Sequence, residues 1–278
     1  MSELSHAKSI LLGAIQGLTE FLPISSSAHL AIAQDRLGLT GDSVDMLLFD
    51  VMVHIATVAS ILIVFARPCL QFLIRMRGEL SPSWTGRRHA TRVAGLAIVA
   101  TIPTAAIGLG FQKELEESFG RPAQVAVELA ITGVLLLTLR WVPRGRRGWG
   151  RFLAWHAAVV GVAQGVAILP GISRSGSTIC AASYIGLRRR WAAEFSFLIA
   201  MPAILGGAFI KGLDTLRLPA QQLEALPWGP IFSGSFVALV VGVISLKMLV
   251  AAVRKAKLHW FAPYCWVVAA IVLWQEWS

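Results

Sequence analysis

Residues 17–30 read GLTEFLPISSSAHL and interrupt an otherwise apolar region of the chain. The neighbouring segments, AKSILLGAIQ before the stretch and AIA after it, would suit a membrane interior. The stretch nevertheless carries an acid (Glu20), three consecutive serines and His29, and its proline cannot continue a helix. Irregular backbone at membrane depth is tolerated only where protein buries it or where it lines a wet cavity. The stretch therefore predicts a broken helical hairpin at an internal site.

The whole chain has the composition of a membrane protein. Of its 278 residues, 56% are hydrophobic and 14% are charged, and the mean hydropathy is +0.67, whereas soluble domains are about 25% charged. The N-terminal region lacks the pattern of a signal peptide. Segments that approach the roughly 20 residues of a membrane span are 47–66, 91–111, 123–142, 191–211, 229–252 and 258–276. We predict an all-α polytopic fold with these six transmembrane helices and two re-entrant helical hairpins, at 5–38 and 152–187.

Loop charge predicts the orientation. The net charge of +10 gathers in short loops between spans, a distribution that argues against nucleic-acid binding. Basic groups, which face the cytoplasm by the positive-inside rule, lie in 67–92, 140–151, 188–190 and 254–257. The alternate loops are acidic or mixed, so both termini are expected outside the cytoplasm. The three cysteines (Cys69, Cys180 and Cys265) have no metal-ligand spacing and are expected to be free thiols.

An internal repeat relates the two broken regions. A shift of 148 residues places 13–39 on 161–187 without gaps, with nine identical pairs in 27 positions. The predicted topology brings one region in from each side, so the repeat is inverted, with copy one at about 1–147 and copy two at about 148–278 of one membrane domain. Such repeats with broken helices put a ligand site near the membrane midplane. Two small-xxx-small glycine pairs, Gly13–Gly17 and Gly161–Gly165, are expected to let helices pack closely.

The two copies differ in their charged residues. Copy one carries Glu20, Ser26 and His29 where copy two carries Ile168, Arg174 and Ser177. An ionised side chain in mid-membrane costs about 3 kcal/mol on insertion scales. Glu20 and Arg174 are therefore expected to serve a site or to pair with each other.

The segment PGISRSGST (170–178) predicts an anion site. A glycine turn before a new helix exposes backbone N–H groups at a positive dipole end, and an arginine fork suits phosphate. LPISSS (22–27) offers the same feature in the other copy. The predicted substrate-binding residues are Ser25, Ser27, Gly171, Ser173, Ser175, Gly176 and Thr178.

Glu20 next to phosphates implies a cation between them. Glu20 with the Gln16 carbonyl one turn earlier is expected to hold Mg²⁺ or Ca²⁺ together with phosphate oxygens and water. A serine near a histidine suggests an activated nucleophile, although membrane serines often only bond back to their own helix. His54 is interpreted as a packed side chain and Glu128 as structural, while Asp50 is left open between a site role and an interfacial one.

At these residues the sequence resembles a known family. QGLTEFLPISSSAH (16–29) and LPGISRSGST (169–178) resemble the two signature motifs of the undecaprenyl-diphosphate phosphatase, or bacitracin resistance protein, family. FDVMVHIATVASILIVF (49–65) and EFSFLIAMPAILGG (194–207) look like further family blocks. The resemblance implies a multi-pass enzyme of the bacterial inner membrane. Such an enzyme removes one phosphate from undecaprenyl diphosphate, which recycles the lipid carrier for cell-wall synthesis and confers bacitracin resistance.

By this resemblance the catalytic residues are Glu20 as the acid, Ser26 as the nucleophile, His29 as its base or proton shuttle, and Arg174. Ser173, Ser175 and Thr178 would grip the diphosphate together with Arg174. Gln16 stands where the family has Glu or Gln, and Ala28 where many members have Gly.

A second function stays open at this point. Inverted repeats with opposed hairpins are also a transporter architecture, so a polyprenyl-phosphate transporter or flippase is the alternative. The expected partners are a polyprenyl diphosphate lipid and membrane lipids, no nucleic acid is expected, and a homodimer is left open.

Overall fold

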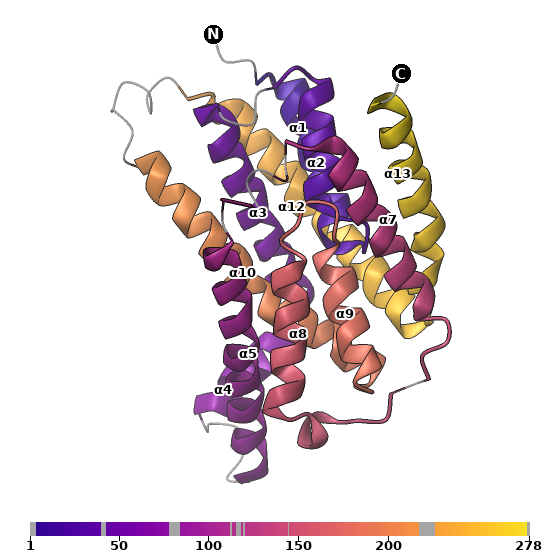
Figure 1. Ribbon diagram of the computed structural model, residues 1–278. Coiled ribbons are helices and arrows are strands. Elements are labelled where there is room, and N and C mark those ends of the chain that lie inside the picture. Colours follow the sequence, from indigo (N-terminus) through magenta and orange to yellow (C-terminus); the bar gives the residue numbers. More distant parts are fainter. Residues whose placement is uncertain are drawn as a thin grey trace.

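The computed structural model describes residues 4–39, 43–77, 84–111, 113–114, 118, 120–143, 145–216 and 226–276. Regular structure in these ranges is helical, apart from an isolated bridge between Arg147 and Leu187. The prediction of an all-α fold is therefore confirmed. The helices, shown in Figure 1, are α1 His6–Phe21, α2 Ser26–Arg36, α3 Val44–Val64, α4 Ala66–Arg77, α5 Trp84–Gly110, α7 Pro122–Thr138, η1 Trp149–Arg151, α8 Ala154–Val166, α9 Arg174–Tyr184, α10 Arg189–Leu216, α12 Trp228–Arg254, η2 Leu258–Phe261 and α13 Ala262–Glu276.

Helix length and composition make this a multi-pass membrane protein. Among the described residues, five segments are long and apolar enough to cross a membrane: Val44–Val64, Ala90–Gly110, Arg189–Leu213, Trp228–Arg254 and Leu258–Glu276. Each overlaps a predicted span. The remaining predicted span, 123–142, corresponds to α7, which is apolar but has only 17 residues. The full count of six spans and two re-entrant hairpins therefore stays a prediction.

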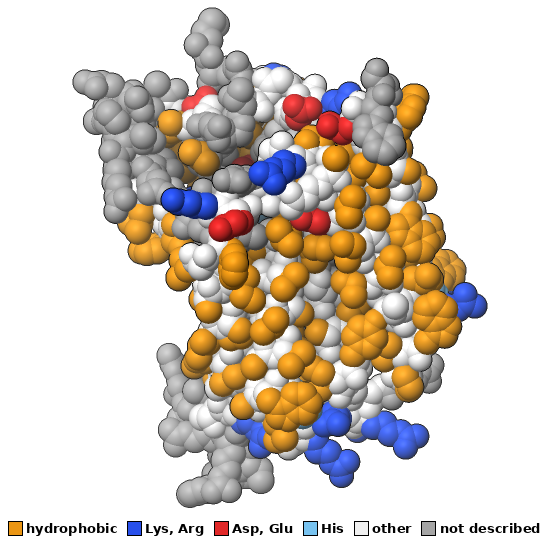
Figure 2. All heavy atoms as spheres, viewed as in Figure 1, with side chains coloured by type: hydrophobic (Ala, Val, Ile, Leu, Met, Phe, Trp, Pro, Cys, Tyr) orange, Lys and Arg blue, Asp and Glu red, His pale blue; other side chains and the backbone are white. Residues whose placement is uncertain are grey.

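The surface agrees with a membrane setting. Figure 2 shows apolar side chains over the middle of the visible face and Lys and Arg side chains at its lower end. Its upper part carries Asp and Glu side chains together with further Lys and Arg side chains. Both chain ends lie at the upper end of the bundle (Figure 1). A band of apolar surface between two charged ends is the pattern expected where lipid tails meet the protein.

The two broken regions form two helical hairpins. Helix α1 ends at Phe21, immediately before Leu22 and Pro23, and α2 begins at Ser26. Helix α8 ends at Val166 and α9 begins at Arg174. Figure 1 shows the first hairpin in the upper half of the bundle and the second in the lower half, with their turns toward each other.

Glycines set the closest helix contacts. A Cβ built on Gly13 of α1 would lie 2.1 Å from the carbonyl oxygen of Gly234 on α12. A Cβ on Gly161 of α8 would lie 2.0 Å from the carbonyl oxygen of Ala100 on α5. Only a residue without a side chain permits these approaches, so the predicted packing role of these glycines is confirmed. The first hairpin thus packs on α12, from the other end of the sequence, and the second hairpin packs on α5.

Candidate active site

The turns of the two hairpins are joined by hydrogen bonds. The hydroxyls of Ser25 and Ser27 donate to the carbonyl oxygen of Pro170, at 2.7 and 2.9 Å. From the other side, the Ser175 hydroxyl donates to the carbonyl oxygen of Leu22 at 3.4 Å. Ser25 has φ +66°, a region that side-chain-bearing residues adopt rarely and that is often found at functional sites. The predicted meeting of the two breaks is therefore present in the structure.

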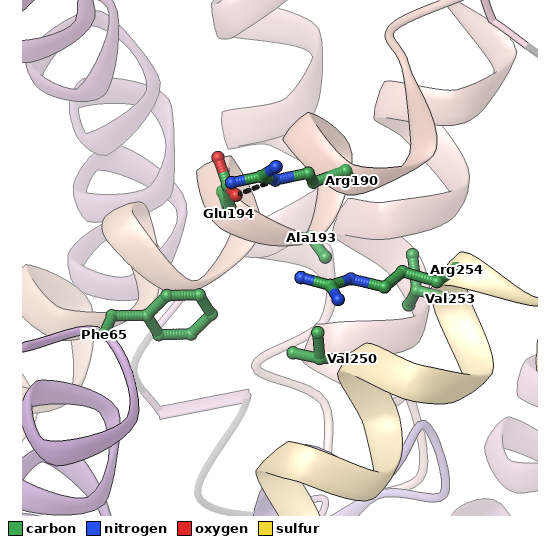
Figure 3. Close-up of a pocket in the computed structure, with 7 residues that line it drawn as sticks. All are labelled: Phe65, Arg190, Ala193, Glu194, Val250, Val253 and Arg254. Atoms are coloured by element: carbon green, nitrogen blue, oxygen red, sulfur yellow. Dashed lines mark hydrogen bonds and ion pairs between the residues drawn. The ribbon is translucent and has the colours of Figure 1, made fainter. Parts of the chain in front are cut away.

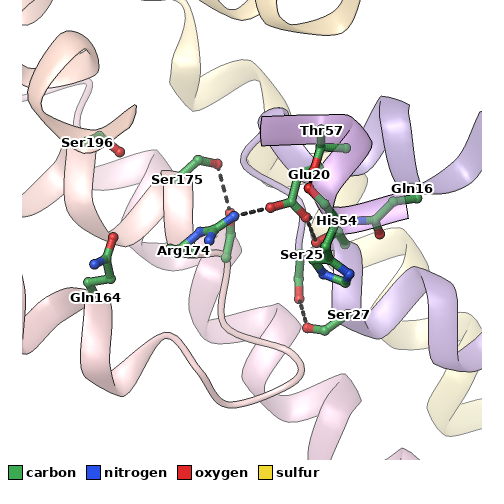
Figure 4. A network of polar contacts seen from close by, with 12 residues as sticks. Gln16, Glu20, Ser25, Ser27, His54, Thr57, Gln164, Arg174, Ser175 and Ser196 are labelled. Atoms are coloured by element: carbon green, nitrogen blue, oxygen red, sulfur yellow. Dashed lines mark hydrogen bonds and ion pairs between the residues drawn. The ribbon is translucent and has the colours of Figure 1, made fainter. Parts of the chain in front are cut away.

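Glu20 is the centre of the polar network in Figure 4. Arg174 Nη2 donates to Glu20 Oε1 as an ion pair between the two hairpins. Glu20 Oε2 accepts from the Ser26 hydroxyl at 2.6 Å and from Gln16 Nε2 at 3.0 Å. The carboxylate is only 5% exposed. Burial of an ion is tolerated where a partner charge and hydrogen bonds compensate for the lost water, and both are present here.

A cavity opens beside the ion pair. Its walls come from both hairpins and from α3 and α10, and its lining residues are Glu20, Phe21, Ile61, Arg174, Ser175, Ser196, Phe197 and Ala200. The Ser196 hydroxyl, on α10, hydrogen-bonds that of Thr178. Sequence reasoning did not single out Ser196, because only packing brings α10 against the second hairpin.

The second hairpin turn is shaped by hydrogen bonds from α7. Glu128 Oε2 accepts from the amide of Gly171 at 3.0 Å, and the Thr132 hydroxyl accepts from the amide of Ser173 at 3.0 Å. The Ser173 hydroxyl accepts from the amide of Gly176 at 3.2 Å and so caps α9. The N–H groups of Gly171 and Gly176 therefore already have partners, Glu128 and Ser173. The structural role expected for Glu128 is confirmed by its contact.

His29 is not hydrogen-bonded to Ser26. Its Nδ1 donates to the carbonyl oxygen of Ser25 at 2.8 Å, and its Nε2 accepts from the Tyr264 hydroxyl at 2.8 Å. The two rings are also stacked, with centroids 5.7 Å apart. The structure thus brings Ser26 to Glu20, and His29 to an aromatic residue of α13 that the sequence pattern did not indicate.

His54, which is interpreted from the sequence as a packed side chain, lies next to the site. Its side chain lies beside Glu20 in the polar network (Figure 4). Its Nδ1 donates to the carbonyl oxygen of Asp50 at 2.6 Å, and Asp50 Oδ1 accepts from Gln34 Nε2 at 2.9 Å. The sequence feature that could have indicated a place for His54 near the site is its i, i+4 spacing from Asp50 on an apolar span.

The donor set beside Glu20 fits a hard divalent cation. Gln16 is fully buried, and its Oε1 has no hydrogen-bond partner. A carboxylate and an unpaired amide oxygen are ligand types that Mg²⁺ and Ca²⁺ accept. The described residues contain no group of three or more His, Cys, Asp or Glu side chains that would form a complete metal site. A cation here would therefore need further oxygen ligands from phosphate and water.

Comparison with known proteins covers nearly the whole chain. The family model described as bacitracin resistance protein BacA matches residues 9–271. A relative from Desulfatibacillum aliphaticivorans, named undecaprenyl-diphosphatase, is 42% identical over 278 residues, which cover 95% of this chain and 96% of the relative. Relatives of the same name from Carboxydothermus hydrogenoformans and Halorhodospira halophila are 38% and 34% identical. Their alignments cover 96% and 95% of this chain, and 95% of each relative.

Proposed function

The chain belongs to the bacitracin resistance protein BacA family, and from that premise we propose that it is an integral membrane phosphatase. It hydrolyses undecaprenyl diphosphate to undecaprenyl phosphate and inorganic phosphate. The observation that carries this function is the Glu20–Arg174 pair, which joins the two hairpin turns beside the Ser26 hydroxyl. The relatives' shared name describes a hydrolase, which favours hydrolysis over the transporter alternative.

Arg174 binds the diphosphate in this proposal. A guanidinium presents several donors in a fixed plane, so it can hold a phosphate while it stays paired with Glu20. The N-termini of α2 and α9 lie at the two hairpin turns, and helix N-termini favour negative charge. The serine and threonine hydroxyls around the turns supply further donors. Fixed donors on both hairpins would orient the terminal phosphate toward Ser26.

Ser26 is the nucleophile and Glu20 is its base. The 2.6 Å hydrogen bond from Ser26 Oγ to Glu20 Oε2 is the geometry required for proton transfer. Ser26 Oγ bonds to the terminal phosphorus while its proton passes to Glu20, and the bond from that phosphorus to the bridging oxygen breaks. Undecaprenyl phosphate leaves. The departing undecaprenyl phosphate takes the proton from Glu20 with it. Water then attacks the phosphoserine with Glu20 as its base, and the proton passes on to Ser26 Oγ as the bond from Oγ to phosphorus breaks. Inorganic phosphate leaves, and the serine hydroxyl and the Glu20 carboxylate are restored.

His29 handles protons at the edge of the site rather than at Ser26. Its hydrogen bonds run to Ser25 and Tyr264, so in this proposal it exchanges protons between the first hairpin turn and the side of the bundle that carries α13. Glu20 and Gln16 Oε1 would hold Mg²⁺ or Ca²⁺. When bound, the cation neutralises charge on the diphosphate, which lets a carboxylate work beside phosphate oxygens.

The membrane topology supports the same function. We propose the bacterial inner membrane, with both termini outside the cytoplasm, because the basic segments 145–151, 188–190 and 254–257 lie at the end of the bundle opposite the termini (Figure 1). An inverted repeat of about 1–147 and about 148–278 fits hairpins that enter from opposite ends. The lipid tail of the substrate would stay among membrane lipids while its diphosphate reaches the hairpin turns.

The test uses the purified full-length chain in detergent. Undecaprenyl diphosphate labelled with ³²P in its terminal phosphate is added with Mg²⁺ or Ca²⁺. We expect release of labelled phosphate and, after rapid quenching, label on the protein that Ser26→Ala abolishes. Absence of phosphate release with either cation would contradict the phosphatase function. If phosphate is released and the Ser26→Ala protein still becomes labelled, the phosphatase function stands and Ser26 is excluded as the nucleophile.

A further inference from the structure

A second cavity lies where α3 and α12 end and α10 begins (Figure 3). Its apolar wall includes Phe65, Val250 and Val253, and its charged residues are Arg190, Glu194 and Arg254. These helix ends lie in the lower part of the bundle in Figure 1, away from the chain termini. None of these residues belongs to the catalytic cavity or to the hairpin turns.

The charged side chains of this cavity are arranged for an anion. Arg190 Nε donates to Glu194 Oε1 at 2.7 Å, one turn along α10. Figure 3 shows the Arg254 guanidinium extending between Ala193 and Val250, below that pair, with no contact drawn to the other lining residues. Two guanidinium groups and one carboxylate leave one net positive charge. A ligand with one negative charge would balance it.

The apolar wall points to a lipid. The helices that form this wall also carry exposed apolar side chains a few residues away from the lining residues. These are Leu62 and Ile63 on α3 and Met248 on α12. Arginine forks beside an apolar surface at a helix end match the depth at which lipid phosphates meet lipid tails. We propose that this cavity binds the head group of a glycerophospholipid whose phosphodiester carries a single negative charge, as in phosphatidylglycerol. The phosphate would lie between Arg190 and Arg254, and an acyl chain along α3.

The proposed lipid site is separate from the catalytic cavity. The Phe65 ring contacts the Phe197 ring, with centroids 5.8 Å apart, and Phe197 in turn contacts Phe21 at 6.0 Å. Phe197 and Phe21 line the catalytic cavity, and Phe65 lines the second one. The two cavities have no lining residue in common. Lipid binding therefore does not depend on the catalytic residues or on the proposed function.

The experiment measures the thermal unfolding midpoint of the purified full-length chain in detergent, with increasing short-chain phosphatidylglycerol. We expect the midpoint to rise by about 3 °C or more when the lipid is in tenfold excess over its Kd. The catalytically impaired Glu20→Gln variant should show the same rise. Arg254→Gln should bind at least about tenfold more weakly, because it loses charged hydrogen bonds.

Lys255→Gln is the matched control. Lys255 is exposed, adjoins Arg254 and does not line the cavity, so its removal changes the local charge equally and should leave the rise intact. If Lys255→Gln weakens lipid binding as much as Arg254→Gln does, the lipid is attracted diffusely to a basic surface, and the proposal is overturned. An undiminished rise in Arg254→Gln, an equal rise with phosphatidylcholine, or an equal rise with inorganic phosphate at the same concentration would also overturn it.

Discussion

Gly38 and Gly186, at equivalent positions of the repeat, both have a left-handed backbone, with φ of +64° and +87°. They end the second helix of each hairpin, and the N–H that follows each glycine closes an equivalent hydrogen bond. Leu39 donates to the carbonyl oxygen of Gln34 at 3.0 Å, and Leu187 to that of Ala182 at 3.0 Å. One third of the aligned residues in the repeat are identical, and the two copies thus also match in backbone conformation. Glycine is the residue that adopts them without strain.

Glu20→Gln removes the charge that pairs with Arg174 and the base for Ser26 while it keeps the side-chain shape. We expect phosphate release to fall by about 10² or more, as is typical of a lost general base. Asp35→Asn, at an exposed acid of α2, is the control and should keep full activity. Turnover of Glu20→Gln within about threefold of wild type would show that Glu20 is not essential to the chemistry.

Arg174→Lys separates a phosphate clamp from a simple counter-ion. Lysine keeps the charge that balances Glu20 but lacks the planar fork. We expect most of the turnover to be lost and KM to rise, while the folded protein survives purification in detergent. Near-full activity with lysine would exclude the clamp and leave charge balance as the role of Arg174.

Gln16→Glu tests the cation site. A second carboxylate beside Glu20 should bind Mg²⁺ or Ca²⁺ more tightly than the amide oxygen does. We expect the cation concentration for half-maximal activity to fall by about tenfold, equivalent to about 1.4 kcal/mol. Calorimetric titration of the protein with the cation gives an independent reading. An unchanged cation affinity would mean that Gln16 is not a ligand.

Gly161→Ala tests the contact between α8 and α5. The added methyl would meet the backbone oxygen of Ala100, which cannot move without shifting a helix. We expect a loss of about 1–3 kcal/mol in the free energy of unfolding, as for other overpacked cores. Gly206→Ala on α10, where a Cβ meets nothing within 4 Å, should be neutral or stabilising. Equal thermal unfolding midpoints for the two variants would refute the contact.

Cysteine labelling tests the orientation in a background without native cysteines. Asp35→Cys and Glu276→Cys introduce thiols at exposed positions of the end that carries the termini. Gly150→Cys and Lys255→Cys do the same at the basic end. We expect an impermeant thiol reagent added outside intact cells to modify only the first two. Modification of all four from one side would disprove the opposed hairpins.

The hairpins could be predicted because their signals are local. Proline and consecutive polar residues stop α1 before Leu22, and the shift of 148 residues transfers the same break to the second copy. The pairing of Glu20 with Arg174 could be anticipated as well, because isolated buried ions are too costly to be common. These inferences needed only the sequence and the energetics of the membrane interior.

The side-chain partners could not be predicted in the same way. Ser196 reaches Thr178, and Tyr264 reaches His29, only because α10 and α13 pack against the hairpins. No sequence spacing encodes these contacts between distant segments. The hydrogen bond of Ser26 to Glu20 rather than to His29, and the positive φ of Ser25, likewise could not be predicted from the sequence.

The contact between Gly13 and Gly234 has a consequence for biosynthesis. Helix α1 leaves the ribosome well before α12, whose backbone it touches. The first hairpin, with its buried carboxylate and broken backbone, must therefore remain in the membrane without its main partner until α12 has been translated. Arg174, which neutralises Glu20, also arrives late. Chains interrupted before α12 would expose an unpaired acid and an open glycine face, which are features that membrane proteases and chaperones can recognise.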